Sequence, residues 1–305
     1  MTAALDIAPR ALICSISKHT SAIIPVPTIR PPAIRPPAVA GAFYPAQPKV
    51  LADAVRELLG AAQVPAGTPK ALIVPHAGYV YSGQTAAAAY SSLTQARASI
   101  RRVVLLGPVH RVPVRGLAAP DADVFATPLG QIPIDRSAIT ALSGLRQVVT
   151  SDAAHAWEHS LEVQLPFLQT VLGDFTLVPL AVGDASAEEV AAVLERLWGG
   201  PETLIVISSD LSHFHNYREA QALDRSTVDA ILHFDHHIHH EQACGGTPIN
   251  GLLLAAQRHG LHAQLLDLCN SGDAVIDGHA VDKSRVVGYA SFAFYESTHN
   301  AHVQH

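Results

Sequence analysis

The sequence predicts an α/β fold, a single domain whose mainly parallel central sheet is covered by helices on both faces. Two observations predict it. Continuous apolar runs of strand length alternate with segments of helical spacing, a pattern typical of parallel strands buried on both faces. Composition does not shift along residues 36–297 and no repeat interrupts them, so we expect one domain there.

The two ends of the chain are expected to lie outside this domain. Residues 1–35 contain the proline-dense run PVPTIRPPAIRPPAV. Each residue before a proline disfavours helix, so we expect an extended or disordered N-terminal arm. Residues 298–305 form a short C-terminal tail that carries histidines.

The spacing of apolar residues predicts the elements of the domain in order. Strands are expected at residues 70–75, 101–108, 176–183, 203–210, 262–273 and 285–295. Helices are expected at residues 47–62, 83–93, 159–173, 186–200, 218–234 and 247–260. Pro48 suits the first turn of the first helix, and Pro166 is expected to kink the third or to split off its first turns.

Composition excludes several classes of function. The net charge is −6, from 20 basic and 26 acidic side chains, so we expect no nucleic-acid partner. No apolar run approaches the roughly 20 residues that a membrane-spanning helix needs, so we expect no membrane partner. The three cysteines form no disulfide framework and no CxxC motif, which predicts a reducing, cytoplasmic location.

Three predicted strands are followed by side chains that carry chemistry. The first strand leads to His76, the second to His110, and the fourth to Asp210 and His213. Because ligands of open α/β sheets bind beyond the carboxyl ends of the strands, we expect these residues to share one site.

Cys244 lies in a glycine-rich turn directly before a predicted helix. The N–H groups at a helix N-terminus lower the pKa of a thiol, so this position favours a thiolate. A small buried residue in a tight turn is the alternative. Two histidines and one cysteinate suit iron(II), copper or zinc. The sequence therefore predicts a metal site made of His76, His110 and Cys244, in which His213 and Asp210 move protons. Asp210 as a helix cap is the alternative.

Further polar and aromatic residues surround these candidates. In AHAWEHSLEVQLPF, Glu158 and His159 are expected either to support the metal ligands from outside or to cap a helix, and direct ligation of the metal is the lesser alternative. Tyr79 and Tyr81 follow His76 closely, and each is expected either to line the pocket or to pack in the core.

Seven stretches of the sequence resemble the Memo family, whose bacterial and archaeal members are often called AmmeMemoRadiSam system protein B. The stretches occur in family order across nearly the whole domain. They are RPPAVAGAFYP (35–45), VPHAGYVYSG (74–83), LLGPVHR (105–111), EHSLEVQLPFL (158–168), VISSDLSHF (206–214), CGGTPI (244–249) and VVGYASFAF (286–294).

The resemblance implies a fold like that of the class III extradiol dioxygenases, the LigB-like group. Those enzymes open catechol rings with iron(II) held by two histidines and a glutamate. In the Memo family the matching pocket has two histidines and a cysteine, which fall here on His76, His110 and Cys244. The acid/base histidine of the dioxygenases matches His213. A cysteine in place of the carboxylate makes the centre more electron-rich and itself oxidisable.

Three functions remain open from the sequence. The first is a metal-dependent redox protein, dioxygenase-like or handling iron or copper. The second is a metal-free cysteine enzyme with Cys244 as nucleophile, His213 as base and Asp210 as orienter. The third is a non-catalytic module that binds metal, a peptide or a small ligand.

A small molecule or a peptide is the expected partner, and a homo-oligomer is compatible with the sequence. Nucleotide-binding and hydrolase motifs are absent from it.

Overall fold

The structure is a computed structural model that describes residues 31–276 and 278–296. A compact unit begins at Pro32, four residues before the predicted domain boundary. The reason is strand β1 (Ile34–Arg35), which pairs in parallel with β5 (Val124–Thr127) and so belongs to the unit. Residues 1–30 of the predicted arm, and the predicted tail, lie outside the described residues.

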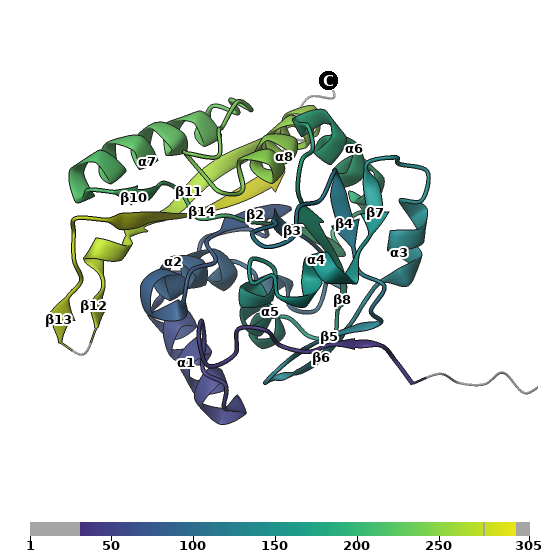
Figure 1. Ribbon diagram of the computed structural model, residues 1–305, viewed down its shortest axis with the longest axis horizontal. Helices are drawn as coiled ribbons and strands as arrows, with labels where there is room; N and C mark the ends of the chain where they lie inside the picture. The colour runs from purple at the N-terminus through teal and green to yellow at the C-terminus, as the bar shows by residue number, and fades with distance from the viewer. Residues whose placement is uncertain (1–30, 277, 297–305) are drawn as a thin grey trace, which may run out of the picture. The chain divides into compact units, whose positions relative to one another are not determined.

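A central sheet forms the middle of this unit (Figure 1). Within the described residues its strand order is β10-β14-β2-β9-β3-β8-β4-β7, and β11 also pairs with β14. The strands are β2 (Ala71–Val74), β3 (Arg102–Pro108), β4 (Leu117–Ala119), β7 (Val148–Thr150), β8 (Thr176–Val182), β9 (Thr203–Ser208), β10 (His213–His215), β11 (Leu261–Asn270) and β14 (Val286–Glu296).

The sheet is mixed, with a parallel centre. Strands β2, β9, β3 and β8 run parallel to one another and are almost completely buried, as their continuous apolar runs predict. On one side β14 is antiparallel to β2, and on the other β4 is antiparallel to β8. The prediction of an α/β fold is confirmed, and antiparallel pairs flank its parallel part.

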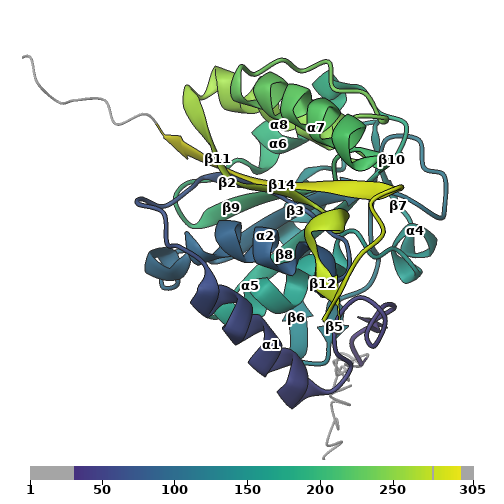
Figure 2. The ribbon, with the colours of Figure 1, turned by 90° about the vertical axis from the view of Figure 1, so that its left-hand side faces the viewer.

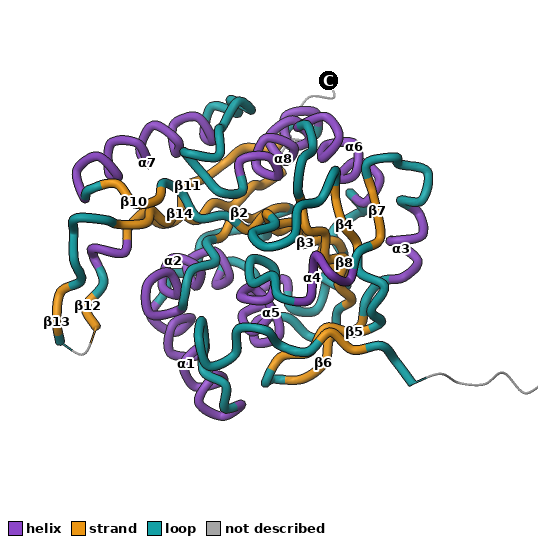
Figure 3. The backbone as a smooth tube through the Cα atoms, viewed as in Figure 1, coloured by secondary structure: helices purple, strands orange, loops and turns teal. Residues whose placement is uncertain are grey.

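Helices cover both faces of the sheet (Figures 2 and 3). On one face lie α1 (Pro48–Ala61), α2 (Tyr79–Ser91) and α5 (Leu165–Val171), whose apolar residues form one core cluster. On the other lie α6 (Ala187–Leu197), α7 (Tyr217–Leu232) and α8 (Gly246–Arg258), which contribute to a second cluster. This arrangement leaves the carboxyl ends of the parallel strands as the edge where loops from both layers meet.

The sequence missed the short elements and misplaced one helix. The missed elements are β5, β6 (Gly130–Pro133), α3 (Arg136–Ala141), α4 (Asp152–Ala156), β12 (Val275–Ile276), β13 (His279–Ala280), η1 (Thr94–Ala96) and η3 (Ser271–Asp273), besides β1, β4, β7 and β10. They are too short to show a period. The helix predicted from residue 159 begins instead as η2 (Glu162–Gln164) and continues as α5, with Pro166 in its first turn. Residues 157–161 therefore form a loop.

Candidate metal centre

The ends of three neighbouring parallel strands carry the predicted residues to one place. His76 follows β2, His110 follows β3, and Asp210 and His213 follow β9, which lies between those two strands. Cys244 approaches from the turn before α8. Its neighbour Gly245 is required there, because a Cβ atom at that position would lie 2.6 Å from the Cβ of Ser209 and 2.9 Å from the carbonyl oxygen of Ser208.

Three histidines form the core of the site. One ring nitrogen each from His76, His110 and His159 lie within 4.8 Å of one another, a cluster that is compatible with a metal site. Their ring centroids are 5.2 Å apart for His76 and His110, 5.3 Å for His76 and His159, and 4.6 Å for His110 and His159. The Sγ of Cys244 lies 3.4 Å from the Nε2 of His76. The loop that carries His159 thus brings in a histidine that the sequence had placed outside the ligand set.

Glu158 orients two of these histidines. Its Oε1 lies 2.9 Å from the Nδ1 of His110 and 3.2 Å from the Nδ1 of His159. The carboxylate also accepts backbone N–H groups of His110, His159 and Ser160. Burial raises the pKa of Glu158, but hydrogen bonds from His110 and His159 outweigh it and hold the pKa far below its usual range. An ionised carboxylate can only accept hydrogen bonds, so both Nδ1 atoms donate and each carries its ring's proton.

Ser208 fixes the third histidine in the same way. Its Oγ donates to the carbonyl oxygen of Ser160 at 2.6 Å, so its remaining lone pairs accept from the Nδ1 of His76 at 2.9 Å and from Gln164 at 2.8 Å. The ring proton of His76 therefore lies on Nδ1, and Nε2 carries the lone pair that can bind a metal. Burial, followed by the nearby His159 and His110, lowers the pKa of His76 well below its usual value. The ring is neutral at pH 7.

The Cys244 thiol differs from the sequence prediction. Burial, and then the charge of Asp210, raise its pKa to about 12, so the helix N-terminus does not make it a thiolate. The physical reason is desolvation, which exceeds the effect of the N–H groups ahead of α8. A metal ion at this place would displace the proton, since a coordinating thiol is deprotonated.

Asp210 and His213 do not form the expected pair. The Oδ1 of Asp210 accepts the backbone N–H of His76 at 2.7 Å, and the Nδ1 of His213 bonds the carbonyl oxygen of Leu211 at 2.8 Å. Asp210 caps no helix either, because β10 follows it and Asn216 caps α7. Burial raises the pKa of Asp210. Asp210 thus holds the backbone of His76. The ring of His213 uses its Nδ1 to bond the Leu211 carbonyl, so its Nε2 is free.

The two predicted tyrosines lie away from the pocket. Tyr79 is buried in the first turn of α2, donates to the carbonyl oxygen of Val163 at 2.8 Å and packs on Phe167. Tyr81 is 37 % exposed and does not line the main cavity. Packing is therefore the role that the structure gives Tyr79.

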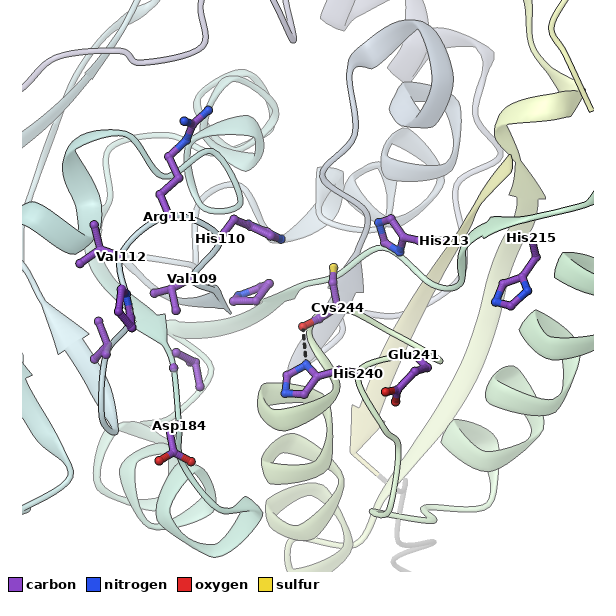
Figure 4. Close-up of a pocket in the computed structure, with 15 residues that line it drawn as sticks. Val109, His110, Arg111, Val112, Asp184, His213, His215, His240, Glu241 and Cys244 are labelled. Carbon is purple, nitrogen blue, oxygen red and sulfur yellow. Dashed lines mark hydrogen bonds between the residues drawn. The ribbon is translucent and has the colours of Figure 1, made fainter. Parts of the chain in front are cut away.

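A cavity of about 850 Å³ opens beside the cluster (Figure 4). One wall is apolar and comes from the loop after β3, with Val109, Val112 and Val114. His110 and Cys244 lie between this loop and His213, which lines the opposite side. The cavity is large enough for a small molecule or for a few residues of a peptide.

No helix in the described part of the chain combines the length and apolar character that crossing a bilayer requires.

Comparisons with known proteins show which family the chain resembles over most of its length. The family model described as Memo-like protein matches residues 35–293. A MEMO1 family protein of Archaeoglobus fulgidus is 35 % identical over 273 residues, which cover 84 % of this chain and 97 % of that protein. One of Aeropyrum pernix is 37 % identical, covering 82 % and 95 %.

A solved structure gives a weaker likeness. It is that of an uncharacterized protein from Escherichia coli K12, with a TM-score of 0.48 at 13 % identity, covering 74 % of this chain and 100 % of that chain. The family model and the relatives, by contrast, extend over nearly the whole described unit. The chain therefore belongs to the Memo family.

Proposed function

We propose that this chain is a metalloprotein that binds one transition-metal ion through His76, His110 and Cys244, with His159 as a fourth side chain facing the ion. The observation that carries the proposal is the hydrogen-bond partner that each Nδ1 atom faces. The Nδ1 atoms of all three histidines face hydrogen-bond acceptors, which leaves the three Nε2 atoms as lone-pair donors. Metal-binding histidines are held in this manner by carboxylates and hydroxyls behind them.

The spacing between His76 and Cys244 fits one ion, although Cys244 is not part of the group of three ring nitrogens within mutual reach. A nitrogen and a sulfur on the same tetrahedral ion lie about 3.5 Å apart. The Nε2 of His76 and the Sγ of Cys244 are 3.4 Å apart. The three ring nitrogens lie within 4.8 Å of one another, which small side-chain movements would close onto an ion.

Donor chemistry narrows the choice of metal. Imidazoles with one thiolate suit copper, iron(II) and zinc, whereas magnesium and calcium prefer oxygen ligands. Iron or copper bound there would supply one-electron redox chemistry, including reactions with O2. We therefore propose a metal-dependent oxidoreductase, with the unidentified small molecule or peptide held in the adjoining cavity.

The protein's own residues would position the substrate and its protons. His213 lines the cavity with its Nε2 free, so it can accept or return a proton at a bound molecule. The apolar wall around Val112 would exclude water from one side of that molecule.

The metal-free cysteine enzyme has less support. Cys244 contacts the ring of His76 and the backbone carbonyl oxygen of Asp210, whereas the Asp210 carboxylate bonds the His76 backbone and His213 bonds Leu211. The side chains of Cys244, His213 and Asp210 therefore form no relay in the described chain. A buried thiol whose pKa is raised to about 12 is also a weak nucleophile at neutral pH.

Cobalt(II) is the probe that tests this donor set. We expect cobalt(II) added to the metal-free protein to show a thiolate charge-transfer band. The Cys244→Ser variant should bind cobalt(II) without that band, whereas His159→Asn should keep it. A parent protein that binds cobalt(II) without any thiolate band would exclude Cys244 from the centre.

A further inference from the structure

The loop between α7 and α8 carries an unusual density of imidazoles close to the proposed centre. Within the sequence ILHFDHHIHHEQ, at positions 231–242, five residues are histidines. They are His233, His236, His237, His239 and His240. Four of them are exposed, and His236 is partly so. A surface of this composition is typical of weak metal binding, provided that the rings are presented in a usable way.

The backbone of this loop is held in one conformation. Ile238 is buried in the core, with 5 % of its surface exposed. The side chain of Asn250 in α8 clamps it, since its Oδ1 accepts the N–H of Ile238 at 3.0 Å and its Nδ2 donates to the carbonyl oxygen at 2.9 Å. Phe234 takes a positive φ of 57°, which is rare for a residue with a side chain and turns the chain sharply. The histidines are therefore presented by a fixed scaffold.

Three of the rings have their Nδ1 bound by an acceptor. The Nδ1 of His233 lies 2.7 Å from the carbonyl oxygen of Asp229, that of His237 lies 2.9 Å from the Oδ1 of Asp235, and that of His240 lies 3.2 Å from the carbonyl oxygen of Cys244. An acceptor at Nδ1 places the proton there and leaves Nε2 as a lone pair. This is the same device that prepares the histidines of the proposed centre.

The loop leads directly to the cysteine of the centre. His240 and Glu241 line the same cavity as Cys244, together with His213 and His215 (Figure 4). The ring of His240 bonds the backbone carbonyl of Cys244 itself. Imidazoles thus lie on the exposed turn, in the lining of the cavity and in the buried cluster.

The two ends of this series differ in the number of donors they offer. Among the described residues, three potential ligands lie within reach of one another in the buried histidine cluster. In the same described residues, no such group of three includes the histidines of the loop. The loop offers pairs, such as His236 and His237 with ring centroids 4.5 Å apart. A pair of imidazoles in water binds an ion more weakly than a buried set of three and releases it faster.

We propose that this loop is a capture surface, which takes a transition-metal ion from solution and passes it through His240 to the centre. The inference rests on the proposed function, because the ion needs the centre as its destination. A local concentration of ligands at the mouth raises the rate at which ions enter, while the final affinity is set by the buried donors.

Loading kinetics test the proposal on the full chain, with residues 297–305 present in every sample. The metal-free protein is mixed with zinc(II) carried by a chromophoric chelator, and transfer is followed in a stopped-flow instrument. The test variant is His236→Asn/His237→Asn/His239→Asn, whose residues lie outside the cavity lining. The control variant is His262→Asn/His279→Asn, two histidines on other elements. The final zinc content is measured for each.

The proposal predicts that the test variant loads about tenfold more slowly than the parent, reaches the same final zinc content, and that the control variant matches the parent. Equal loading rates in the test variant and the parent would overturn it. A test variant that loses final zinc content would also overturn it, because the loop would then be part of the binding site. If the zinc taken up by the parent protein does not depend on His76, the proposed function is refuted, and the capture surface is refuted with it.

Discussion

Glu158 holds His110 at two points, with one carboxylate oxygen 2.9 Å from the ring Nδ1 and the other 2.6 Å from the backbone nitrogen. The same carboxylate reaches His159. A single buried acid thus fixes the position and the tautomer of two imidazoles at once.

The Glu158→Gln substitution should weaken metal binding without removing a ligand. The amide of glutamine places N–H donors where the carboxylate accepted hydrogen bonds, so the two Nδ1 atoms lose their common acceptor. We expect the affinity for zinc(II) to fall by about 10–100-fold, measured by competition with a chelator. Glu57→Gln, on the exposed side of α1, is the matched control and should bind as the parent does. Parent-like affinity in a folded Glu158→Gln variant would contradict this role.

Metal affinity should rise with pH, and Cys244 should cause the rise. The pKa of its thiol is raised to about 12 by burial and by Asp210, so binding a metal as thiolate releases a proton at pH 7–9. His76, whose pKa is lowered, is already neutral and releases none. The dissociation constant should therefore fall about tenfold per pH unit. Titrations at three pH values measure the slope, and Cys244→Ser should flatten it. A pH-independent affinity in the parent would argue against thiolate ligation.

A buried ion pair fastens the N-terminal strand to the loop of the site. Arg35 pairs with Glu162 and donates to the carbonyl oxygens of His155 and Glu158. Arg35→Ala leaves the carboxylate of Glu162 buried without its cation, so the free energy of unfolding should drop by about 3–5 kcal/mol. Urea denaturation measures it. Lys49→Ala, which removes an exposed pair, should leave the midpoint unchanged. If both variants unfold at the parent's midpoint, the ion pair does not stabilise the fold.

The sequence predicted the long elements because their pattern and length agree. Strands such as β3 and β9 are continuous apolar runs, and each ends in the polar residues that the site uses. Topology then follows, because neighbouring parallel strands deliver His76 and His110 to the same edge.

Other features depend on contacts between distant residues. His159 was assigned to a helix, but the loop before α5 turns it onto His110, and only the three-dimensional packing shows this. The adjacency of Glu158 and His159 was the available signal. The pKa of Cys244 was predicted in the wrong direction because burial, which sequence does not reveal, outweighs the helix N-terminus.

The most direct test of the central claim is the metal content of the full chain, purified without oxygen and without chelator, in the parent and in His76→Ala/His110→Ala. The histidines of the capture surface and of residues 297–305 remain in both proteins, so they contribute equally to the measured metal content. The account predicts about one ion of iron, copper or zinc per chain in the parent and its loss in the variant. The same metal content in both proteins would contradict it.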